Sequence, residues 1–296
     1  MTHPSGAATS AAPGFVDLHM HSTASDGALS PAAVVEAARA AGLRAIALTD
    51  HDTLEGIPEA RRAADAAGIR VIAGAELSVM FDGRELHLLA LHVDRSAALE
   101  AELAELRAAR RGRAERIVAR LNALGVPLRL DAVLAEAGEG AIGRPHVARA
   151  MLAGGWARDF RDAFDRYLGN GRPAHVEKRR LDASDAIDLV HEAGGLAIFA
   201  HPGTTGSRER IERLVALGLD GVEVLHPSHT SEDLARLDTL VRHFHLVPSG
   251  GSDWHGTPDG PRTIGCMHVP SAMLERQDAL LVEREARRAA PTAPRG

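Results

Sequence analysis

The sequence predicts an α/β fold in which strands form a parallel sheet or barrel and a helical segment interrupts the strand order. Short apolar stretches alternate with amphipathic helical patterns in the first third and the last third of the chain, which is typical of parallel βα units. The alternation stops between residues 97 and about 190, where no good strand pattern occurs. Polar residues gather at the strand ends, where α/β proteins build their sites.

The first part of the chain predicts four strands and two helices. Ser30 is a suitable helix cap and Pro31 suits a first helical position, so a helix begins there and ends at Gly42. A second helix ends at Gly68. The strands are predicted at 15–21, 43–51, 69–76 and 84–93.

The middle of the chain is predicted to be a mostly helical insertion over 97–190. One long amphipathic pattern covers 96–125, and shorter helices with glycine stops are predicted at 130–138, 145–155 and 157–169. Strand and helix then alternate again, with helices predicted at 183–195, 208–218 and 231–244 and strands at 196–201, 220–226 and 245–255. About seven strand–helix units result, fewer than the eight of a regular barrel.

Composition and length indicate a globular protein with a net negative charge. With 296 residues, of which 45% are hydrophobic and 25% charged, the chain can form one large domain with an insertion. The barrel is predicted over 14–96 and 191–285, with disordered tails at 1–13 and 286–296. The net charge of −6 argues against broad nucleic-acid binding, so no DNA duplex is expected as a partner.

Further features bear on location. No apolar run is long enough to span a bilayer, so no membrane partner is expected. A single cysteine, Cys266, excludes an internal disulfide, and the N-terminus lacks a signal-peptide pattern. A cytoplasmic location is therefore expected.

Metal-ligand types recur along the predicted strands. Asp17, His19 and His21 lie at alternate positions, so a strand directs all three to one face, where burial is costly unless a partner such as a metal satisfies them. A lone histidine such as His87 is more typical of core packing, but the set as a whole indicates a metal centre. The nine candidate ligands are His19, His21, Asp26, His51, Glu76, His87, His201, Asp253 and His255. Without a cysteine among them, they predict two or three divalent ions, with Mn²⁺, Fe²⁺ or Zn²⁺ favoured.

These residues resemble the motifs of the polymerase and histidinol phosphatase (PHP) family. The matching stretches are DLHMHS at 17–22, TDHD at 49–52, GAE at 74–76, AHP at 200–202 and SDWH at 252–255. The resemblance runs from Phe15 to about residue 270. It implies a distorted seven-stranded (β/α) barrel of the PHP type with a trinuclear metal site at its carboxyl face.

Other stretches resemble the stand-alone branch of the family that includes nucleoside 3′,5′-bisphosphate phosphatases and 5′-to-3′ exonucleases of short RNA. They are GRPHVA at 143–148, FDRYLGNGRPAHVEK at 164–178 and GVEVLHPSH at 221–229. One departure is Asp26, where some members carry a histidine. The resemblance implies a first ion on His19, His21, Glu76 and Asp253, a second on Asp26, His51 and His255, and a third on Glu76, His87 and His201.

The predicted reaction is hydrolysis of a phosphate ester of a nucleoside 3′,5′-bisphosphate, which releases phosphate and a nucleoside monophosphate. Water activated by clustered divalent ions would attack phosphorus. His226 is expected to protonate the leaving oxygen, with His201 as the alternative if the third ion is absent, and Asp50 is a second catalytic candidate.

A bisphosphate needs a second phosphate site away from the metals. The candidates are Arg144, His146, Lys178 and His229, because arginine binds phosphate through two hydrogen bonds and lysine as a point charge. A helix-capping role is the alternative for Arg144. Lys178 is the only lysine of the chain.

Three other functions stay open at this point. They are 5′-to-3′ exonuclease action on short RNA, a phosphatase of another small phosphomonoester such as histidinol phosphate, and a non-catalytic, metal-stabilised interaction module. An aromatic content of 3% disfavours tracking of long single strands. The expected partner is a small nucleotide or a short RNA end, and the sequence does not indicate an oligomeric state.

Overall fold

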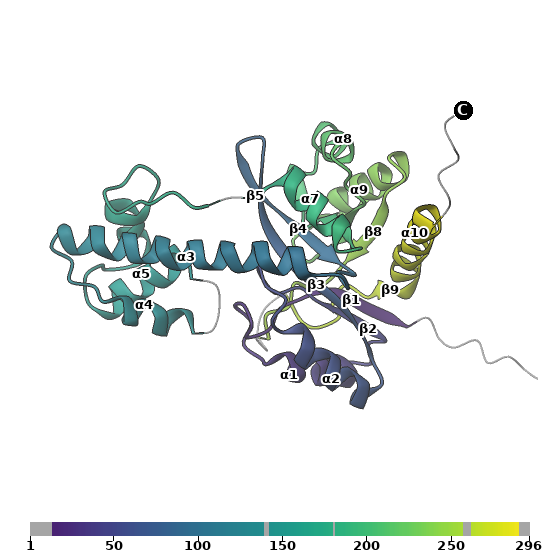
Figure 1. Cartoon of the computed structure of the whole chain (residues 1–296), viewed down its shortest axis with the longest axis horizontal. Helices are drawn as coiled ribbons and strands as arrows, with labels where there is room; N and C mark the ends of the chain where they lie inside the picture. Colours follow the sequence, from purple (N-terminus) through teal and green to yellow (C-terminus); the bar gives the residue numbers. More distant parts are fainter. Residues whose placement is uncertain (1–13, 139–141, 180, 257–261, 290–296) are drawn as a thin grey trace, which may run out of the picture.

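The structure is a computed structural model that describes residues 14–138, 142–179, 181–256 and 262–289 (Figure 1). Its strands form one sheet that curls into an open barrel, which confirms the predicted α/β class. Seven strands correspond to the seven predicted: β1 (Phe15–Met20), β2 (Ala45–Leu48), β3 (Arg70–Phe81), β4 (Arg84–Leu91), β6 (Leu196–Phe199), β7 (Gly221–Leu225) and β8 (Val247–Gly250). Two further strands, β5 (Leu181–Asp182) and β9 (Val269–Pro270), have two residues each.

The order of the strands explains the distortion of the barrel. The sheet runs β8-β7-β6-β4-β3-β2-β1-β9, and β5 pairs with β3. The first and last long strands approach each other through a single bridge between Met20 and Trp254 and through a 2.9 Å hydrogen bond from the Asp253 N–H to the His19 carbonyl. The residues that follow β1 and β8 therefore lie side by side.

The strand β4 departs from the parallel arrangement. It pairs antiparallel with both β3 and β6, so the expectation of a purely parallel sheet is wrong here. The cause is visible in the sequence, because only Asp82 and Gly83 separate β3 from β4, and a two-residue connection with a positive φ at both positions makes a hairpin. The candidate ligand His87 lies within this antiparallel strand.

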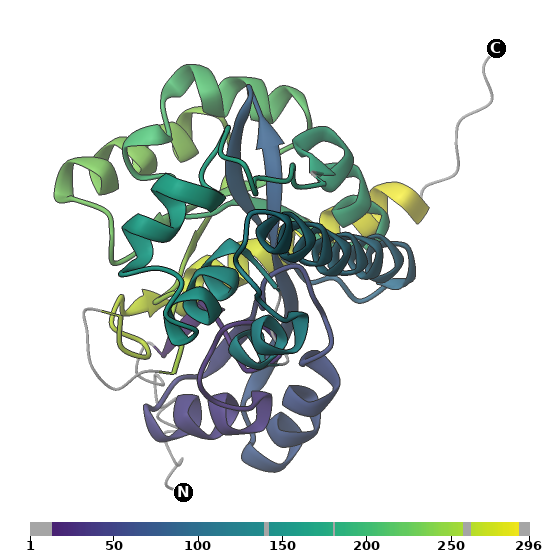
Figure 2. The same ribbon diagram turned by 90° about the vertical axis from the view of Figure 1, so that its left-hand side faces the viewer.

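Helices cover the outer face of the barrel, as Figure 2 shows with α3 seen nearly end-on. The helices α1 (Pro31–Ala40) and α2 (Ile57–Ala67) lie together on one side. The helices α7 (Ala183–Glu192), α8 (Arg208–Ala216) and α9 (Ser231–His243) lie on the other side. As predicted, the Ser30 side chain caps α1 and accepts a hydrogen bond from the Ala33 N–H. Buried leucine, isoleucine and valine side chains of the strands and these helices form the main core.

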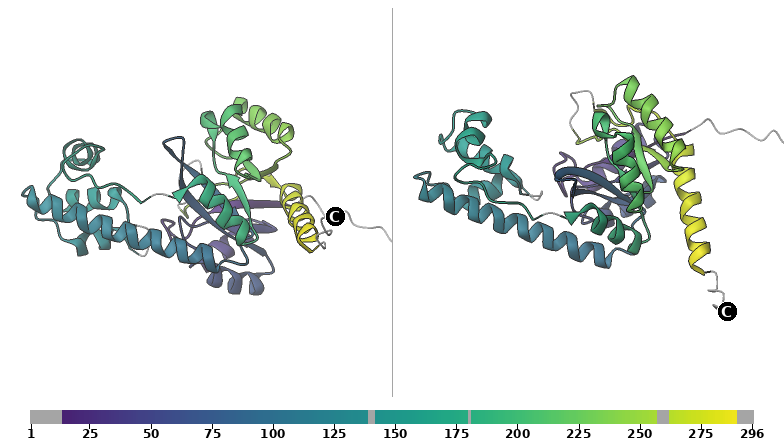
Figure 3. Two further views of the ribbon diagram at one scale, coloured as in Figure 1. Left: turned by 45° about the horizontal axis from the view of Figure 1, so that its top comes forward. Right: turned by 90° about the horizontal axis from the view of Figure 1, so that it is seen from above.

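A second core lies in the helical insertion, which projects from the barrel along α3 (Figure 3). It includes α4 (Leu130–Ala137), α5 (Arg144–Ala153), α6 (Phe160–Ala163) and a π-helical turn at Phe164–Leu168. The helix α3 (Ala97–Ala123) belongs to both cores, because Leu99 and Leu103 pack with the barrel and Leu121 packs with the insertion.

The part of the chain that packs away from the barrel is shorter than the predicted insertion over 97–190. Leu181 and the buried side chains of α7 belong to the main core, and β5 falls in a segment where no strand was expected. A two-residue strand has too few residues to show a period in the sequence.

The last helix, α10 (Ser271–Ala289), packs against the end of the barrel opposite the insertion. Residues 286–289 belong to it, so the tail predicted to be disordered from residue 286 is helical in this part. The predicted tail over 1–13 and residues 290–296 lie outside the described residues. Among the helices that the structure describes, none has the length and apolar character to cross a membrane.

Candidate metal centre

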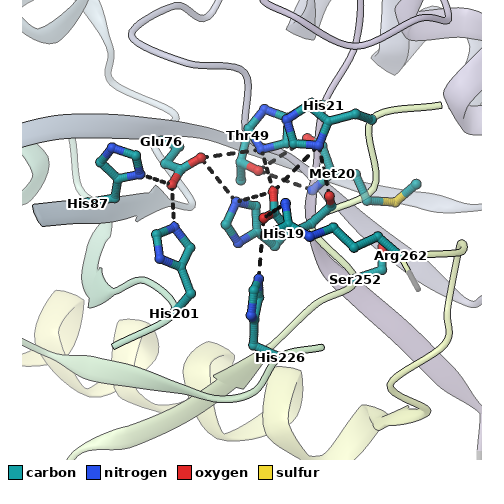
Figure 4. Close-up of polar contacts among 12 residues, drawn as sticks. His19, Met20, His21, Thr49, Glu76, His87, His201, His226, Ser252 and Arg262 are labelled. Carbon is teal, nitrogen blue, oxygen red and sulfur yellow. Dashed lines mark hydrogen bonds and ion pairs between the residues drawn. The ribbon is translucent and has the colours of Figure 1, made fainter. Parts of the chain in front are cut away.

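The first group of candidate ligands lies where β1, β3 and β8 meet (Figure 4). His19 and His21 come from the end of β1, Glu76 from the middle of β3 and Asp253 from the loop after β8. The Nε2 atom of His19 lies 3.2 Å from the Glu76 Oε2 atom and 3.5 Å from the Asp253 Oδ1 atom. The Nε2 atom of His21 lies 3.3 and 3.2 Å from the same two oxygens. A tetrahedron with bonds of 2.0–2.1 Å has edges of about 3.3–3.4 Å, so these donor atoms suit one divalent ion.

A second group adjoins the first. Asp26 faces His51 at 3.8 Å and His255 at 3.4 Å, and the Nδ1 atom of His21 lies 3.8 Å from the Asp26 carboxylate. His51 also faces the Glu76 Oε2 atom at 3.3 Å. The structure thus brings together the three residues that the family resemblance assigns to a second ion.

The third group uses the other oxygen of Glu76. The Oε1 atom lies 2.5 Å from the Nδ1 atom of His87 and 2.8 Å from the Nε2 atom of His201. One carboxylate therefore faces all three groups, which is the arrangement expected of a bridging ligand.

Burial and charge set the protonation of these groups. Burial opposes ionisation of Glu76, but the adjacent His19 and His51 hold the pKa of its carboxyl well below the ordinary value. Burial lowers the pKa of His51 to about 4, so its imidazole is neutral at neutral pH and has a free lone pair. Burial acts against protonation of His21 too, but the carboxylates of Asp253 and Glu76 raise its pKa to about 9. The two carboxylates thus favour the protonated, positively charged form of His21.

The residues fit a divalent metal on a second ground. Both ring nitrogens of His21 are buried and make no hydrogen bond with the described residues, although they face the carboxylates of Glu76, Asp253 and Asp26. Buried polar atoms without hydrogen bonds are costly, and a divalent ion held by nitrogen and oxygen donors would satisfy them. Eight of the nine predicted ligands fall into overlapping groups of donors, and the ninth, His201, joins them through its contact with Glu76.

The backbone at the centre adopts unusual conformations. Asp52, His201 and Asp253 have φ values of 51°, 27° and 51° in the left-handed region. Such residues cost about 1–3 kcal/mol each and cluster at functional sites. Gly251 allows a close approach, because a Cβ atom there would lie 2.3 Å from the Cβ atom of His19.

Glu223 is a residue that the ligand prediction did not include. Its side chain is fully buried, its Oε1 atom lies 3.0 Å from the Nδ1 atom of His19, and its Oε2 atom accepts a 2.6 Å hydrogen bond from the His201 N–H. It therefore orients His19 with the Nε2 atom toward Glu76 and Asp253. A carboxylate behind a ligating histidine is typical of metal sites. Its place at the end of a predicted strand was the available signal.

Asp17 and Asp50 support the centre rather than face it. Asp17 accepts 2.9 Å hydrogen bonds from the N–H groups of Ser252 and Gly265. The Asp50 carboxylate accepts 2.7 Å hydrogen bonds from the N–H and hydroxyl groups of Ser22 and from a nearby serine hydroxyl. Asp50 thus anchors the loop that carries Asp26, and the prediction that it is a catalytic residue has no support in its contacts.

His226 lies beside the centre. Its Nε2 atom is 3.3 Å from the Asp253 Oδ2 atom, and its Nδ1 atom is 2.7 Å from the Ser228 hydroxyl. Arg262, which the sequence did not single out, forms an ion pair with the same oxygen of Asp253. The two oxygens of Asp253 therefore face opposite sides, one toward the histidine pair of β1 and one toward His226 and Arg262.

Two of the four predicted phosphate-binding residues line one cavity of about 500 Å³, which we call the cationic cavity. Arg144 and Lys178 lie there with Arg110, Arg113 and His175. The Arg144 guanidinium donates to the Leu168 carbonyl at 3.1 Å and to the Asn170 side chain at 2.9 Å. Burial lowers the pKa of Lys178, and its ammonium pairs with Glu85 at 3.1 Å.

The other two predicted phosphate-binding residues lie elsewhere. The Nδ1 atom of His146 accepts a 2.9 Å hydrogen bond from the Gly143 N–H and thereby caps α5, and its side chain lines a separate cavity next to Asp26. His229 uses both ring nitrogens on the backbone, since Nδ1 donates to the Val224 carbonyl at 2.8 Å and Nε2 accepts from the Gly203 N–H at 3.1 Å. His229 thus has no free ring nitrogen for a phosphate, and this prediction is wrong for it.

Arg110 and Arg113 of the cationic cavity were missed, although the sequence carries a signal. The buried stripe of α3 runs through Leu103 and Leu106, and the two arginines continue its spacing before Ile117. Charged residues in an apolar stripe indicate a polar space beneath the helix. Arg110 forms an ion pair with the buried Asp52, next to the candidate ligand His51.

Known proteins resemble this chain over most of its length. The family model for the PHP domain matches residues 17–120. A 5′-3′ exoribonuclease of Haemophilus influenzae is 40% identical over 245 residues, which are 81% of this chain and 89% of that protein. A 3′,5′-nucleoside bisphosphate phosphatase of Chromobacterium violaceum is 36% identical over 84% of this chain and 90% of its own length. A solved structure from Bifidobacterium adolescentis, assigned as a metal-dependent phosphoesterase, has a TM-score of 0.76 and 32% identity and covers 90% of this chain and 97% of that chain.

Proposed function

Since this chain belongs to the PHP domain family, we propose that it is a metal-dependent phosphoesterase that hydrolyses the 3′-phosphate ester of nucleoside 3′,5′-bisphosphates. The products are inorganic phosphate and a nucleoside 5′-monophosphate. The expected partner is a small nucleotide, and the alternative is a short RNA end.

The observation that carries the proposal is the pairing of the metal centre with the cationic cavity. Glu85 connects the two regions, since it lines the cavity, pairs with Lys178 and lies two residues before His87 on β4. Four cationic side chains line the cavity, against two carboxylates. A substrate with two phosphates gains from both regions, because arginine and lysine hold the non-scissile phosphate while the scissile phosphate meets the metal centre.

The reaction requires few groups of the chain. Divalent ions held by the candidate ligands would supply Lewis acidity to the phosphoryl group. A water oxygen adds to phosphorus, the bond between phosphorus and O3′ breaks, and O3′ takes a proton. His226 is the proposed proton donor, with its ring oriented by Ser228 and Asp253, and His201 is the alternative. Arg144 and Lys178 hold the 5′-phosphate and so fix the ribose.

The types of donor atom restrict which metal ions suit the site. Six imidazoles and three carboxylates without a thiolate suit Mn²⁺, Fe²⁺ or Zn²⁺. Two or three ions are expected, because the donors form three groups joined by Glu76. Asp26 in the second group gives that ion a harder oxygen ligand than a histidine would.

A second activity, 5′-to-3′ hydrolysis of short RNA, breaks the same kind of bond, between phosphorus and O3′. In RNA with a 5′-phosphate, the ester at O3′ of the first nucleotide carries the next nucleotide on its phosphorus. Hydrolysis between phosphorus and O3′ then releases a nucleoside 5′-monophosphate. The observation that favours this activity is that the centre adjoins a further cavity, beside His87 and His201.

A panel of three substrates with added Mn²⁺ tests the proposal. We expect the highest kcat/KM for a nucleoside 3′,5′-bisphosphate, mononucleotide release from a 5′-phosphorylated trinucleotide, and poor hydrolysis of histidinol phosphate, which has one phosphate. Preference for histidinol phosphate would contradict the proposed substrate class. Absence of hydrolysis of all three would favour a non-catalytic module instead.

A further inference from the structure

The hairpin of β3 and β4 separates the cationic cavity from a second cavity of about 550 Å³, which we call the threonine cavity because Thr204, Thr205 and Thr230 line it. Opposite residues of an antiparallel pair share a face of the hairpin. Met80 lines the cationic cavity and the next pair, Phe81–Arg84, lines the threonine cavity, while Glu85, opposite Met80, lines both.

We infer that the threonine cavity binds the nucleotide on the 3′ side of the scissile phosphate of a short, 5′-phosphorylated RNA. This inference rests on the proposed function and specifies the place of the second nucleotide. His87 and His201 of the third ligand group form part of the cavity wall. A group attached to the phosphorus at the metal centre therefore enters the cavity directly.

The charge of the cavity suits a phosphodiester. The Arg84 guanidinium forms no ion pair or hydrogen bond with the residues that the structure describes, and Arg210 donates only to the neutral carbonyl of Thr205, at 3.1 Å. The carboxylates of the wall are engaged elsewhere. Asp233 accepts hydrogen bonds from Arg236 at 2.6 Å and from the Thr230 hydroxyl at 2.8 Å, and Glu85 pairs with Lys178. Two positive charges thus remain available to RNA phosphates.

The other groups of the wall suit a nucleoside. Phe81 and Leu86 supply apolar surface, while the exposed Thr204 supplies a hydroxyl group. Phe81, Leu86 and Thr204 do not offer the paired donor and acceptor of an amide side chain, so we expect the cavity to bind a nucleotide without reading its base. A nucleoside bisphosphate leaves the cavity empty, because its scissile phosphate carries no further group.

The chemistry explains why both cavities serve one reaction. When the bond between phosphorus and O3′ of the first nucleotide breaks, water supplies the new oxygen on phosphorus and a proton passes to O3′. The phosphate stays on the second nucleotide as a new 5′-phosphate. The shortened RNA is again a substrate, since its 5′-phosphate fits the cationic cavity.

The double variant Arg84→Ala/Arg210→Ala tests this inference. We expect kcat/KM for a 5′-phosphorylated trinucleotide to fall about 10-fold or more, because two contacts to charged groups are lost. Hydrolysis of a nucleoside 3′,5′-bisphosphate should stay unchanged. Arg208→Ala is the matched control. Arg208 lies on α8, as Arg210 does, but it contacts His243 at 3.2 Å and does not line the cavity.

The outcomes separate the inference from the proposed function. Unchanged trinucleotide hydrolysis, or an equal loss on both substrates, would overturn the assignment of the cavity. If the unmodified protein hydrolyses neither substrate with Mn²⁺ present, the proposed function itself fails. Arg84 is exposed, and the half-buried Arg210 makes only the hydrogen bond to the Thr205 carbonyl, so melting temperatures close to that of the unmodified protein are expected.

Discussion

Neighbouring side chains fix the direction of each candidate ligand. Glu76 faces three donor groups because β3 is extended there and its two oxygens point to different histidines. His19 faces Glu76 because Glu223 holds the opposite nitrogen. The alternation of His19 and His21 was readable in the sequence, but the partner of His19 was not, since it lies 204 residues away on another strand.

The first prediction concerns Glu223→Gln. The amide keeps the size of the side chain but removes the charge behind His19, so the Mn²⁺ affinity should fall about 10- to 100-fold. Calorimetric titration of the metal-free protein with Mn²⁺ measures this. Glu232→Gln, at an exposed position of α9, is the control. An unchanged affinity in a folded Glu223→Gln protein would show that Glu223 does not support the metal centre.

The second prediction concerns Arg144→Ala. If the guanidinium binds the non-scissile phosphate, kcat/KM for a nucleoside 3′,5′-bisphosphate should fall about 10- to 150-fold, since a contact with a charged group contributes about 1.5–3 kcal/mol. A nucleoside 3′-monophosphate should lose little, because it has no second phosphate. Arg144→Lys should recover part of the loss.

Arg161→Ala changes an exposed arginine of the insertion and is the control for Arg144→Ala. Equal losses of kcat/KM on the bisphosphate and the monophosphate would indicate that Arg144 stabilises the insertion and does not bind the second phosphate. Its hydrogen bonds to Leu168 and Asn170 give that alternative a physical basis, so the melting temperature must be measured in parallel.

Among the secondary-structure elements, the sequence predicted all seven longer strands from short apolar or alternating runs, but β3 continues to Phe81, beyond its predicted end at residue 76. The direction of β4 was not recognised, although the short Asp82–Gly83 connection indicates a hairpin. The end of the insertion was also misplaced, since the amphipathic pattern of α7 does not show which core its apolar face joins. Such choices depend on tertiary packing.

The third prediction concerns the core of the insertion. Leu121→Ala should lower the free energy of unfolding by about 2–5 kcal/mol, because the side chain is fully buried between α3 and its neighbours. Leu124→Ala, three residues on and 45% exposed, should lower it far less. Urea unfolding followed by circular dichroism measures both. Equal, small effects would mean that the insertion lacks a packed core of its own.

At the scale of the whole molecule, the barrel supplies the metal centre and the insertion supplies one wall of the cationic cavity. The helix α3 joins the two, with its first half in the main core and its second half in the insertion core (Figure 1). Arg110 of this helix pairs with Asp52, so the wall of the cationic cavity is tied to the loop that carries His51. Under the proposed function, a substrate with two phosphates would span this junction.

The metal dependence of bisphosphate hydrolysis by the intact chain tests directly whether the clustered histidines and carboxylates form a catalytic metal centre. Elemental analysis should find two or three divalent ions per chain. Treatment with EDTA followed by desalting should abolish phosphate release from a nucleoside 3′,5′-bisphosphate, and added Mn²⁺ should restore it. Full activity of a protein that holds less than one ion per chain in EDTA would contradict the account, because the clustered histidines and carboxylates would then have no part in the reaction.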